Sequence, residues 1–282
     1  MSHGNRKLWV IVAVLTGAAG ILPAGAQLPS LNDDGFLGYF VGFENKRYQF
    51  GITAQGRSTL KVIGKKGEPL TDKLTVAVEF LVEEILPDGK TYVRFIVPES
   101  LESAQPATDK PKNIVFRGKV KGDAAFEVSM NEDRGVVSLG GRLLDPGTLK
   151  KHPLRFSIRM KFPDAYPYEK KGGDKKQQKA FEEKSKGDRL QLVWTDGKKV
   201  KQSTSVSVDA GSPDLNGPGI AAAEIEFSSY QENRIQVTAS ENSVLKLSNS
   251  QAGPLQEGFF LTWIADPAKD PEGKARLSFE VK

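Results

Sequence analysis

The sequence predicts an all-β protein, built as two tandem antiparallel β-sandwich modules joined by a charged linker. Three observations carry this prediction. Short stretches of alternating apolar and polar residues recur after residue 26, at roughly the 8–12-residue spacing typical of sandwich folds. A segment of mixed charge and low apolar content separates two groups of these stretches. Outside that segment, the mature sequence shows no long amphipathic helix pattern.

Residues 1–26 have the organisation of a signal peptide. Arg6 and Lys7 supply positive charge, residues 8–22 form an apolar core, and Ala24-Gly25-Ala26 matches a small-x-small cleavage site. The apolar core is shorter than the roughly 20 residues of a membrane-spanning helix; the alternative is an uncleaved anchor. We therefore expect export by the Sec route to the periplasm or beyond, a mature chain starting near Gln27, and no transmembrane segment after cleavage.

Composition excludes several classes of site. The chain has no cysteine, which excludes disulfides, thiolate nucleophiles and a lipidated cysteine anchor. The formal net charge of +5 falls to +3 in the mature chain, because the signal peptide removes Arg6 and Lys7 and no acid, leaving 38 basic and 35 acidic side chains. This near balance argues against a nucleic-acid-binding protein, which would present a strongly basic surface.

The first module is predicted at residues 27–162. It opens with Tyr39, Val41 and Phe43 alternating on one strand, then a turn at Glu44-Asn45-Lys46 and a second alternating stretch at 48–54. Period-two alternation of aromatic and β-branched residues is typical of half-buried strands. Further strands are expected at 59–63, 73–86, 90–98, 113–120, 125–130, 136–139 and 154–162.

Residues 163–189 form the predicted linker. It starts with Pro163 and Pro167, contains Gly172-Gly173, and carries a charged run that buries too little apolar surface to order itself. Good helix formers at Lys175–Lys184 predict one short helix, without the broad apolar stripe of a core helix. These features favour a hinge between two separate modules.

The second module is predicted at residues 190–282. Its strands are expected at 190–194, 203–208, 222–228, 234–239, 244–247, 258–264 and 275–281. The stretch 258–264 is apolar on both faces. It is therefore either a central strand covered on both sides or a partner interface formed by Phe259, Leu261 and Trp263.

The two modules also resemble each other. Residues 60–78 align with 190–208 without a gap, and 155–161 align with 276–282 in the same order. Identity is low and period-two patterns match by chance, so duplication and coincidence both stay open. The general pattern resembles exported bacterial proteins built from immunoglobulin-like or related β-sandwiches, a likeness of fold that says little about function.

No catalytic residue is predicted. His152 is the single histidine of the mature chain, and its Lys-His-Pro setting indicates a surface turn rather than the base of a Ser-His-Asp triad. Glycoside cleavage uses two carboxylates that flank the scissile bond, and Glu79, Glu83 and Glu84 are acids close enough in sequence to be considered for this role. Their strand spacing fits solvated glutamates on a polar face equally well.

Calcium is the one cofactor that the sequence suggests. Asp209, Asp214 and Asn216 lie in one segment, and their carboxylate and amide oxygens are ligands that Ca²⁺ prefers. The spacing does not match an EF-hand loop, and the same residue types are ordinary in turns.

Four aromatic side chains are candidate ligand-binding residues. Tyr166 and Tyr168 lie in the linker, Trp194 follows it closely, and Trp263 lies in the apolar strand. Their rings offer faces for stacking on sugars. The alternative is that they fill the junction between the modules.

These observations favour an exported, non-enzymatic binding or scaffold protein of the bacterial cell envelope or extracellular space, with a protein or glycan partner. The alternative is a carbohydrate-binding protein or a glycan-acting hydrolase that uses stacking aromatics or paired carboxylates. A third hypothesis is attachment to an acidic polymer through the lysines of residues 170–186. The sequence makes no prediction about the oligomeric state.

Overall fold

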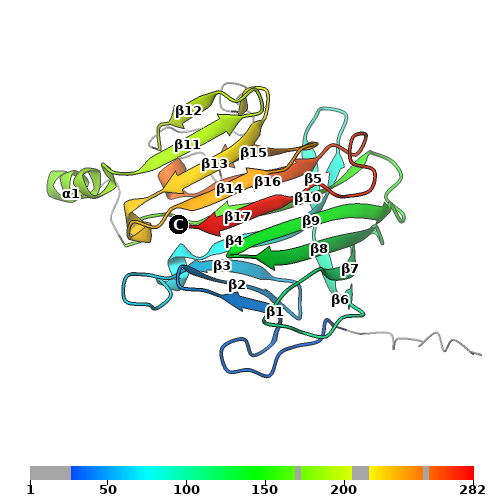
Figure 1. Cartoon of the computed structure of the whole chain (residues 1–282). Coiled ribbons are helices and arrows are strands. Elements are labelled where there is room, and N and C mark those ends of the chain that lie inside the picture. The colour runs from blue at the N-terminus through cyan, green and yellow to red at the C-terminus, as the bar shows by residue number, and fades with distance from the viewer. Residues whose placement is uncertain (1–26, 169–172, 205–215, 250–253) are drawn as a thin grey trace, which may run out of the picture.

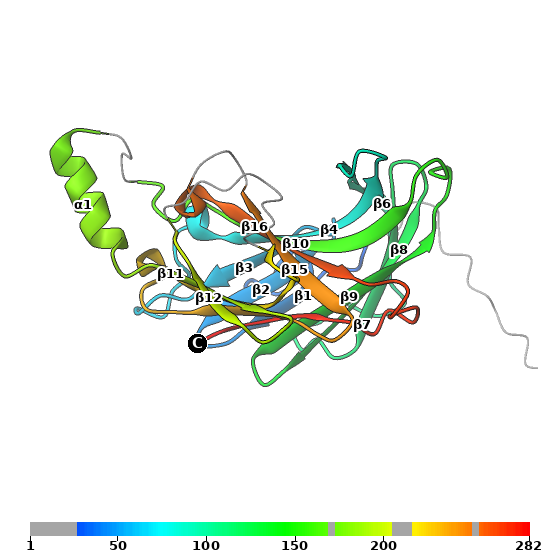
Figure 2. The ribbon, with the colours of Figure 1, turned by 90° about the horizontal axis from the view of Figure 1, so that it is seen from above.

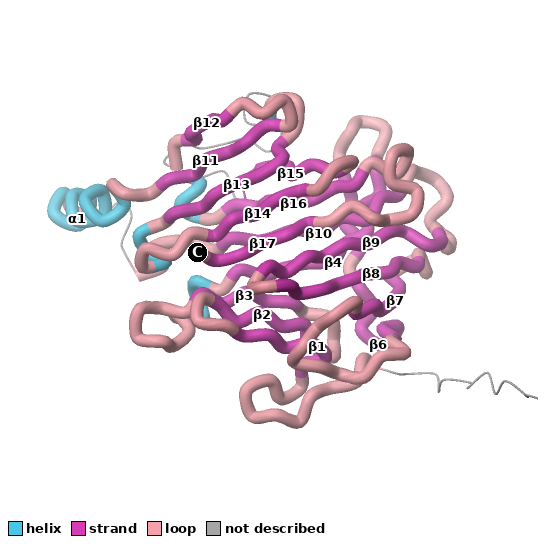
Figure 3. The backbone as a smooth tube through the Cα atoms, in the orientation of Figure 1, coloured by secondary structure: helices cyan, strands magenta, loops and turns pink. Residues whose placement is uncertain are grey.

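The computed structural model describes residues 27–168, 173–204, 216–249 and 254–282, and it is mostly β (Figures 1 and 3). Seventeen strands join in one hydrogen-bonded network. The strands are β1 (Tyr39–Glu44), β2 (Tyr48–Thr53), β3 (Ser58–Val62), β4 (Val76–Ile85), β5 (Thr91–Arg94), β6 (Ile96–Glu102), β7 (Ile114–Val120), β8 (Ala125–Asp133), β9 (Val136–Asp145), β10 (Leu154–Phe162), β11 (Arg189–Trp194), β12 (Lys199–Gln202), β13 (Ile220–Glu226), β14 (Ile235–Ala239), β15 (Ser243–Asn249), β16 (Phe259–Ala265) and β17 (Leu277–Val281). The helices in these ranges are α1 (Lys175–Ser185) and three short 3-10 turns, η1 (Asp72–Leu74), η2 (Ser228–Tyr230) and η3 (Leu255–Glu257).

The network contains two antiparallel runs of strands. The first run, which we call the first layer, follows the order β1-β2-β3-β4-β10-β16-β15. The second layer follows the order β13-β14-β17-β9-β8-β7-β6. A bridge between Ile220 and Leu245 joins the layers through β13 and β15, while β11 and β12 extend the other edge of β13. The result is a curled sheet (Figure 2).

Aromatic rings hold the two layers face to face. Phe50 of β2 meets Phe279 of β17 with ring centroids 5.2 Å apart. Phe126 of β8 stacks on Phe156 of β10 at 5.9 Å, and Phe80 of β4 lies 5.6 Å from Phe116 of β7. Edge-to-face and offset-stacked pairs at these distances stabilise a core beyond the burial of their area. The alternating residues that point inward from each layer therefore meet in one interior.

The prediction of an antiparallel, mostly β chain is confirmed, but the two tandem immunoglobulin-like modules need correction. β10, predicted to close the first module, pairs with β16 of the second along six residues, from Ser157 opposite Ile264 to Phe162 opposite Phe259. β17 pairs with β9 in the same way, with Phe279 opposite Val137. Buried apolar residues of 27–162 and 190–282 belong to one contact cluster. Neither range forms a sheet of its own.

The charged segment between β10 and β11 is an excursion from this sheet. The Tyr166 hydroxyl donates to Asp188 Oδ1 at 2.7 Å, so the two ends of the excursion are tied together. Asp188 also accepts from the backbone N–H of Ser228 at 2.8 Å and from Gln256 Nε2 at 3.1 Å. The charged composition of residues 163–189 thus reflects an exposed excursion with anchored ends, and not a boundary between two domains.

The short helix predicted within this segment is confirmed. α1 begins after Asp174, whose side chain accepts from the backbone N–H of Gln177 and so caps the first turn. The helix has no buried residue and stands out from the strands at one end of the molecule (Figures 1 and 2). Phe181 touches the body through the Tyr166 ring, at a centroid distance of 5.2 Å.

The aligned segments of the proposed repeat do not have equivalent neighbours. β10, which contains all of residues 155–161, pairs with β4 and β16. β17, within the matching residues 276–282, pairs with β14 and β9. Alternation explains the sequence match without equivalent positions in the fold.

Within the described residues, none of the helices combines the length and the apolar character needed to span a lipid bilayer.

Two buried tyrosines predict a loss of stability at alkaline pH. Burial raises the pKa of Tyr48, with Glu132 and Glu280 adding to the effect, and burial also raises the pKa of Tyr230. A raised pKa in the folded state stabilises the protein below pH ~10, the ordinary tyrosine value, and this contribution is lost as pH rises toward the folded-state pKa. We expect the unfolding free energy to fall by up to ~1.4 kcal/mol per pH unit for each tyrosine above pH ~10.

Urea unfolding between pH 8 and pH 11 measures this slope. The Tyr48→Phe/Tyr230→Phe variant should have a shallower slope, although loss of the 2.8 Å hydrogen bond from Tyr48 to the Gly135 carbonyl lowers its stability at every pH. Tyr168→Phe is the matched control, because the Tyr168 side chain is exposed. An equal flattening in the control would contradict the assignment.

Candidate ligand-binding groove

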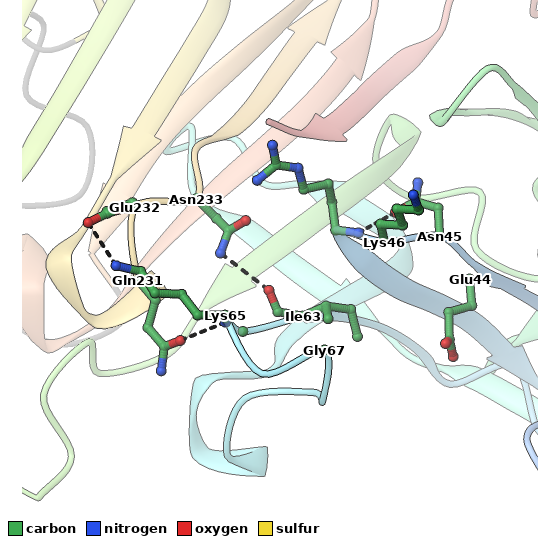
Figure 4. A pocket seen from close by; sticks show the side chains of 11 residues that line it. Glu44, Asn45, Lys46, Ile63, Lys65, Gly67, Gln231, Glu232 and Asn233 are labelled. Atoms are coloured by element: carbon green, nitrogen blue, oxygen red, sulfur yellow. Dashed lines mark hydrogen bonds and ion pairs between the residues drawn. The ribbon is translucent and has the colours of Figure 1, made fainter.

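A cavity lies where turns from the first part of the chain, residues 44–47 and 63–67, meet residues 231–233 (Figure 4). Its volume is about 900 Å³, within the range of ligand-binding pockets. We call it the junction groove. It is lined by Glu44, Asn45, Lys46, Arg47, Ile63, Gly64, Lys65, Gly67, Gln231, Glu232 and Asn233. Ten of these eleven residues are polar, charged or glycine, so the groove is suited to a hydrogen-bonding ligand.

The first wall is the turn between β1 and β2. Asn45 Oδ1 accepts from the backbone N–H groups of Arg47 and Tyr48, at 2.8 and 3.0 Å. The backbone N–H of Asn45 donates to the Tyr48 carbonyl at 3.0 Å. An asparagine side chain that bonds to the backbone two residues on is a standard way to hold a turn. The exposed side chains of Lys46 and Arg47 therefore rise from a fixed backbone.

The second wall is the turn that follows β3. The backbone N–H of Gly67 donates to the Gly64 carbonyl at 2.9 Å, and Gly67 has φ of 78°, a conformation that favours glycine. The backbone N–H of Ile63 donates to the Arg47 carbonyl at 2.8 Å, which ties the second wall to the first. A Cβ at Gly64 would lie 2.8 Å from Gln231 Oε1, so glycine lets the third wall approach.

The third wall comes from the loop between η2 and β14. Gln231 Oε1 accepts from the backbone N–H of Lys65 at 3.0 Å, across 166 residues of sequence. Glu232 pairs with Lys65 Nζ at 2.8 Å. The buried Asn233 side chain donates to the Ile63 carbonyl at 3.3 Å and to the Tyr230 carbonyl at 2.8 Å. Figure 4 shows these contacts on one side of the groove and Glu44 on the other.

Two consecutive residues of this wall are held in a costly backbone conformation. Gln231 has φ of 55° and Glu232 has φ of 73°, both in the left-handed region. A non-glycine residue there costs on the order of 1–3 kcal/mol and persists where surrounding contacts require it. Such residues cluster at functional sites. Glycine would adopt these φ values without strain, yet the chain has Gln231 and Glu232 here. The unfavourable backbone conformation therefore points to a role for the two side chains.

A second cavity of about 530 Å³ adjoins the groove. It shares Lys65, Gln231 and Glu232 with the junction groove and continues past Arg189 and Glu226. Arg189 and Glu226 lie opposite each other in the pairing of β11 with β13. The shared wall is thus open to solvent on both sides, with charges of both signs along it.

The groove contains donors and acceptors on opposite walls. Glu44 accepts from Gln49 Nε2 at 3.0 Å, and Glu232 is engaged by Lys65. Within the described part of the chain, the side chains of Lys46 and Arg47 have no ion pair or hydrogen bond. These two cations are available to a ligand, while both carboxylates retain lone pairs for ligand hydroxyls.

The predicted aromatic ligand residues are not gathered in one place. Tyr166 and Trp263 are buried, with 1% and 0% of their surface exposed, so neither ring can stack on a ligand. Trp194 is half-buried, and its ring packs against Gly217. A Cβ added to Gly217 would lie 2.6 Å from Cδ2 of that ring. Tyr168 is exposed, and its hydroxyl is 3.0 Å from Thr71 Oγ1. None of the four lines the junction groove.

The apolar strand predicted as a partner interface is interior. Phe259, Leu261 and Trp263 of β16 are 0% exposed. β16 lies between β10 and β15, and Phe259 stacks on Phe162 at 4.5 Å. The interface prediction is therefore corrected in favour of the alternative, a central strand covered on both sides.

The calcium prediction is not supported at the one position that the structure describes. Asp209 and Asp214 lie outside the described residues. Asn216 Oδ1 accepts from the Leu247 backbone N–H at 2.7 Å, and its amide donates to the Leu247 carbonyl at 3.2 Å, so its side chain serves the backbone. Among the residues described, no three histidine, cysteine, aspartate or glutamate side chains form a group that would hold a metal ion.

The three neighbouring glutamates of residues 79–84 form ion pairs with arginines of adjacent strands. Glu79 pairs with Arg159 at 2.7 Å, and Glu83 pairs with Arg155 at 2.8 Å. On the adjoining strand β5, Arg94 pairs with Glu84 at 2.7 Å. Cross-strand pairs of opposite charge stabilise a sheet, and here they engage Arg155 and Arg159 of β10.

The junction groove is not predicted from the sequence. The turn at residues 44–46 is recognisable as a connection between two strands, and residues 64–67 carry an equally clear Gly-Lys-Lys-Gly turn signal. Each turn is ordinary alone. No local pattern shows that Gln231 and Glu232 lie against them.

Comparisons with known proteins give a likeness of fold and no family. No protein-family model matches the chain, and no curated protein sequence does. Among solved structures, α-N-acetylgalactosaminidase NagBb from Bifidobacterium bifidum, in complex with Gal-NHAc-DNJ, is similar over 86% of this chain at 10% identity and a TM-score of 0.51. This chain covers 36% of that enzyme's length.

A second similar structure is the Slr1438 protein from Synechocystis sp. PCC 6803. The match covers 86% of this chain and 94% of that protein, at 13% identity and a TM-score of 0.45. Identities this low concern the fold alone, because one fold hosts many unrelated sites.

Proposed function

We propose that this chain is an exported, non-enzymatic binding protein that holds a glycan of the bacterial cell envelope or extracellular space in the junction groove. The observation that carries the proposal is a groove of about 900 Å³ whose walls are three mutually tied turns with polar side chains. Saccharide hydroxyls both donate and accept hydrogen bonds. Lys46 and Arg47 supply donors, and Glu44 and Glu232 supply acceptors.

A glycan fits this groove better than a protein partner does. Protein interfaces depend on aromatic and apolar anchors that fill desolvated pockets. Ile63 is the single apolar side chain among the lining residues, and the groove holds no aromatic ring. Export, expected from residues 1–26, brings the protein to where envelope glycans occur. The fold likeness to part of a glycosidase is compatible with this ligand class and does not support it further.

The alternative is a glycan-acting hydrolase. A glycosidase needs two carboxylates that flank its substrate, and both Glu44 and Glu232 line the groove. Each already has a partner, Gln49 for Glu44 and Lys65 for Glu232, which favours binding over proton transfer. Incubation with the bound oligosaccharide decides between them, because newly formed reducing ends would contradict the non-enzymatic proposal.

Replacing the strained acid should separate binding from stability. We expect Glu232→Gly to weaken the binding of neutral oligosaccharides by about tenfold, because it removes a charged acceptor for their hydroxyls. Its stability should stay within ~1 kcal/mol of the parent value or rise, because glycine adopts φ of 73° without strain and an exposed ion pair contributes little. Biolayer interferometry on a panel of immobilised neutral and acidic oligosaccharides measures binding, and urea unfolding measures stability.

Asp123→Gly is the matched control for that variant. Asp123 is an exposed acid with φ of 62° in the turn between β7 and β8, so it shares the charge and the strain of Glu232 but does not line the groove. Its glycan affinity should match the parent chain. Binding of no member of the panel by the parent chain, or unaltered binding by Glu232→Gly, would count against the groove as a glycan site.

A further inference from the structure

We infer that the glycan of the junction groove carries a carboxylate, which Lys46 and Arg47 bind together. This inference rests on the proposed function and names the chemical class of its ligand. A carboxylated saccharide unit, such as a uronic acid, has one negative charge beside several hydroxyls. The charges of the groove suit that combination better than a neutral sugar.

The three cationic side chains of the groove differ in whether they have an ion-pair partner. Lys65, the third cation of the groove, is bound to Glu232 at 2.8 Å. Lys46 and Arg47 are adjacent on the first wall, and among the residues that the structure describes neither has a side-chain partner. A neutral ligand would leave both positive charges unmatched, whereas a carboxylate would accept from both.

The backbone under these two cations is prearranged. The Arg47 N–H donates to Asn45 Oδ1 at 2.8 Å, and the Arg47 carbonyl accepts from Ile63 at 2.8 Å. The next residue, Tyr48, is buried and anchored by its hydroxyl to the Gly135 carbonyl at 2.8 Å. Binding therefore orders side chains only, which lowers the entropic cost of holding an anion. The planar guanidinium of Arg47 matches a carboxylate in a bidentate geometry.

The acids of the groove argue for a singly charged ligand with hydroxyls. Glu44 directly precedes the turn that carries Lys46 and Arg47, and Glu232 lines the third wall. These two carboxylates would repel a doubly charged phosphate group of a ligand more strongly than a singly charged carboxylate. Sugar hydroxyls, by contrast, donate to them. The groove thus combines a cationic subsite on the first wall with acceptors on either side.

A matched pair of oligosaccharides tests the charge requirement. The probes are a galacturonic acid oligomer and the same oligomer after chemical reduction of its carboxyl groups, measured by isothermal titration calorimetry with the mature chain. We expect the acidic form to bind at least tenfold more tightly. The difference should shrink as sodium chloride is raised from 20 to 500 mM, because salt screens exposed charges.

A matched pair of variants assigns that preference to the turn. Lys46→Ala/Arg47→Ala should bind the two oligomers with equal affinity. Lys150→Ala/Lys151→Ala removes two exposed lysines before β10, outside the groove, and should keep the tenfold preference. Arg47→Lys keeps the charge and loses the bidentate fork, so an intermediate preference is expected. Circular dichroism establishes that each variant is folded before binding is measured.

The outcomes distinguish this inference from the proposed function. Equal binding of the acidic and reduced oligomers by the parent chain would overturn the inference and leave a neutral glycan site. A preference that survives in Lys46→Ala/Arg47→Ala would place the carboxylate elsewhere and overturn the inference as well. Binding of neither oligomer, nor of any member of the panel above, would overturn both proposals.

Discussion

Cutting the chain between Gly173 and Asp174 is expected to leave one folded particle rather than two domains. Fragments 27–173 and 174–282, expressed separately, should each lack a cooperative unfolding transition. β10 would lose β16 along six residue pairs, and β9 would lose β17. Each fragment would also expose aromatic rings of the shared core, such as Phe50 and Phe279. Mixed or coexpressed, the fragments should form a 1:1 complex with the far-ultraviolet circular dichroism of the intact chain.

The intact chain with a protease site inserted between the same two residues is the control. After cleavage, size-exclusion chromatography should give a single native peak that separates into two fragments only in denaturant. The hydrogen bonds of Asp188 to Tyr166, Ser228 and Gln256 do not involve the cleaved peptide bond. They hold both ends of the excursion in place after cleavage. Two fragments that each unfold cooperatively on their own would restore the picture of independent modules.

Truncation of Phe279 should cause a large loss of stability from a single substitution. Phe279 lies on β17 with 1% of its surface exposed, and its ring contacts Phe50 at 5.2 Å and Tyr48 at 6.4 Å across the two layers. Phe279→Ala removes a large buried ring and leaves a cavity that neighbouring strands fill only partly. A loss of ~3–5 kcal/mol in the unfolding free energy is expected from equilibrium urea unfolding.

Phe95→Ala is the control of the same chemistry. Phe95 lies between β5 and β6 and is 62% exposed, so its truncation should alter stability by no more than ~0.5 kcal/mol. Comparable losses in the two variants would show that Phe279 does not join the layers. A loss at Phe279 together with a smaller denaturant dependence would indicate a less compact native state.

Local sequence signals predicted most of the strands. The alternation of β7, whose residues are alternately buried and exposed from Ile114 to Val120, follows the pattern that identified the strand. Hairpin turns such as residues 44–47 and the capped helix after Asp174 were also readable, because they depend on neighbours a few residues away. Predicted strand 203–208 falls mostly outside the described residues.

The candidate site was much less predictable. Aromatic residues drew attention as ligand platforms, yet Tyr166 and Trp263 are buried because the core needs their area. The groove instead consists of lysine, arginine and amide side chains in turns, which are common on any surface. Long-range contacts such as those of Lys65 with Gln231 and of Ile63 with Asn233, 166 and 170 residues apart, turn them into a site.

Composition and period-two patterning were sufficient to predict an antiparallel β chain, a short exposed helix near residue 180, and the exclusion of thiol and multi-histidine chemistry. They were insufficient to assign partners to the strands, because alternation tells which side of a strand is buried and not which strand covers it. β10 and β16 illustrate the limit, since each is apolar enough to pair with several strands, and the packing of Phe162 on Phe259 selects one arrangement. That long-range pairing converts two apparent modules into one core, while contacts of Gln231 and Asn233 with residues 63–65 bring ordinary turns together as a groove.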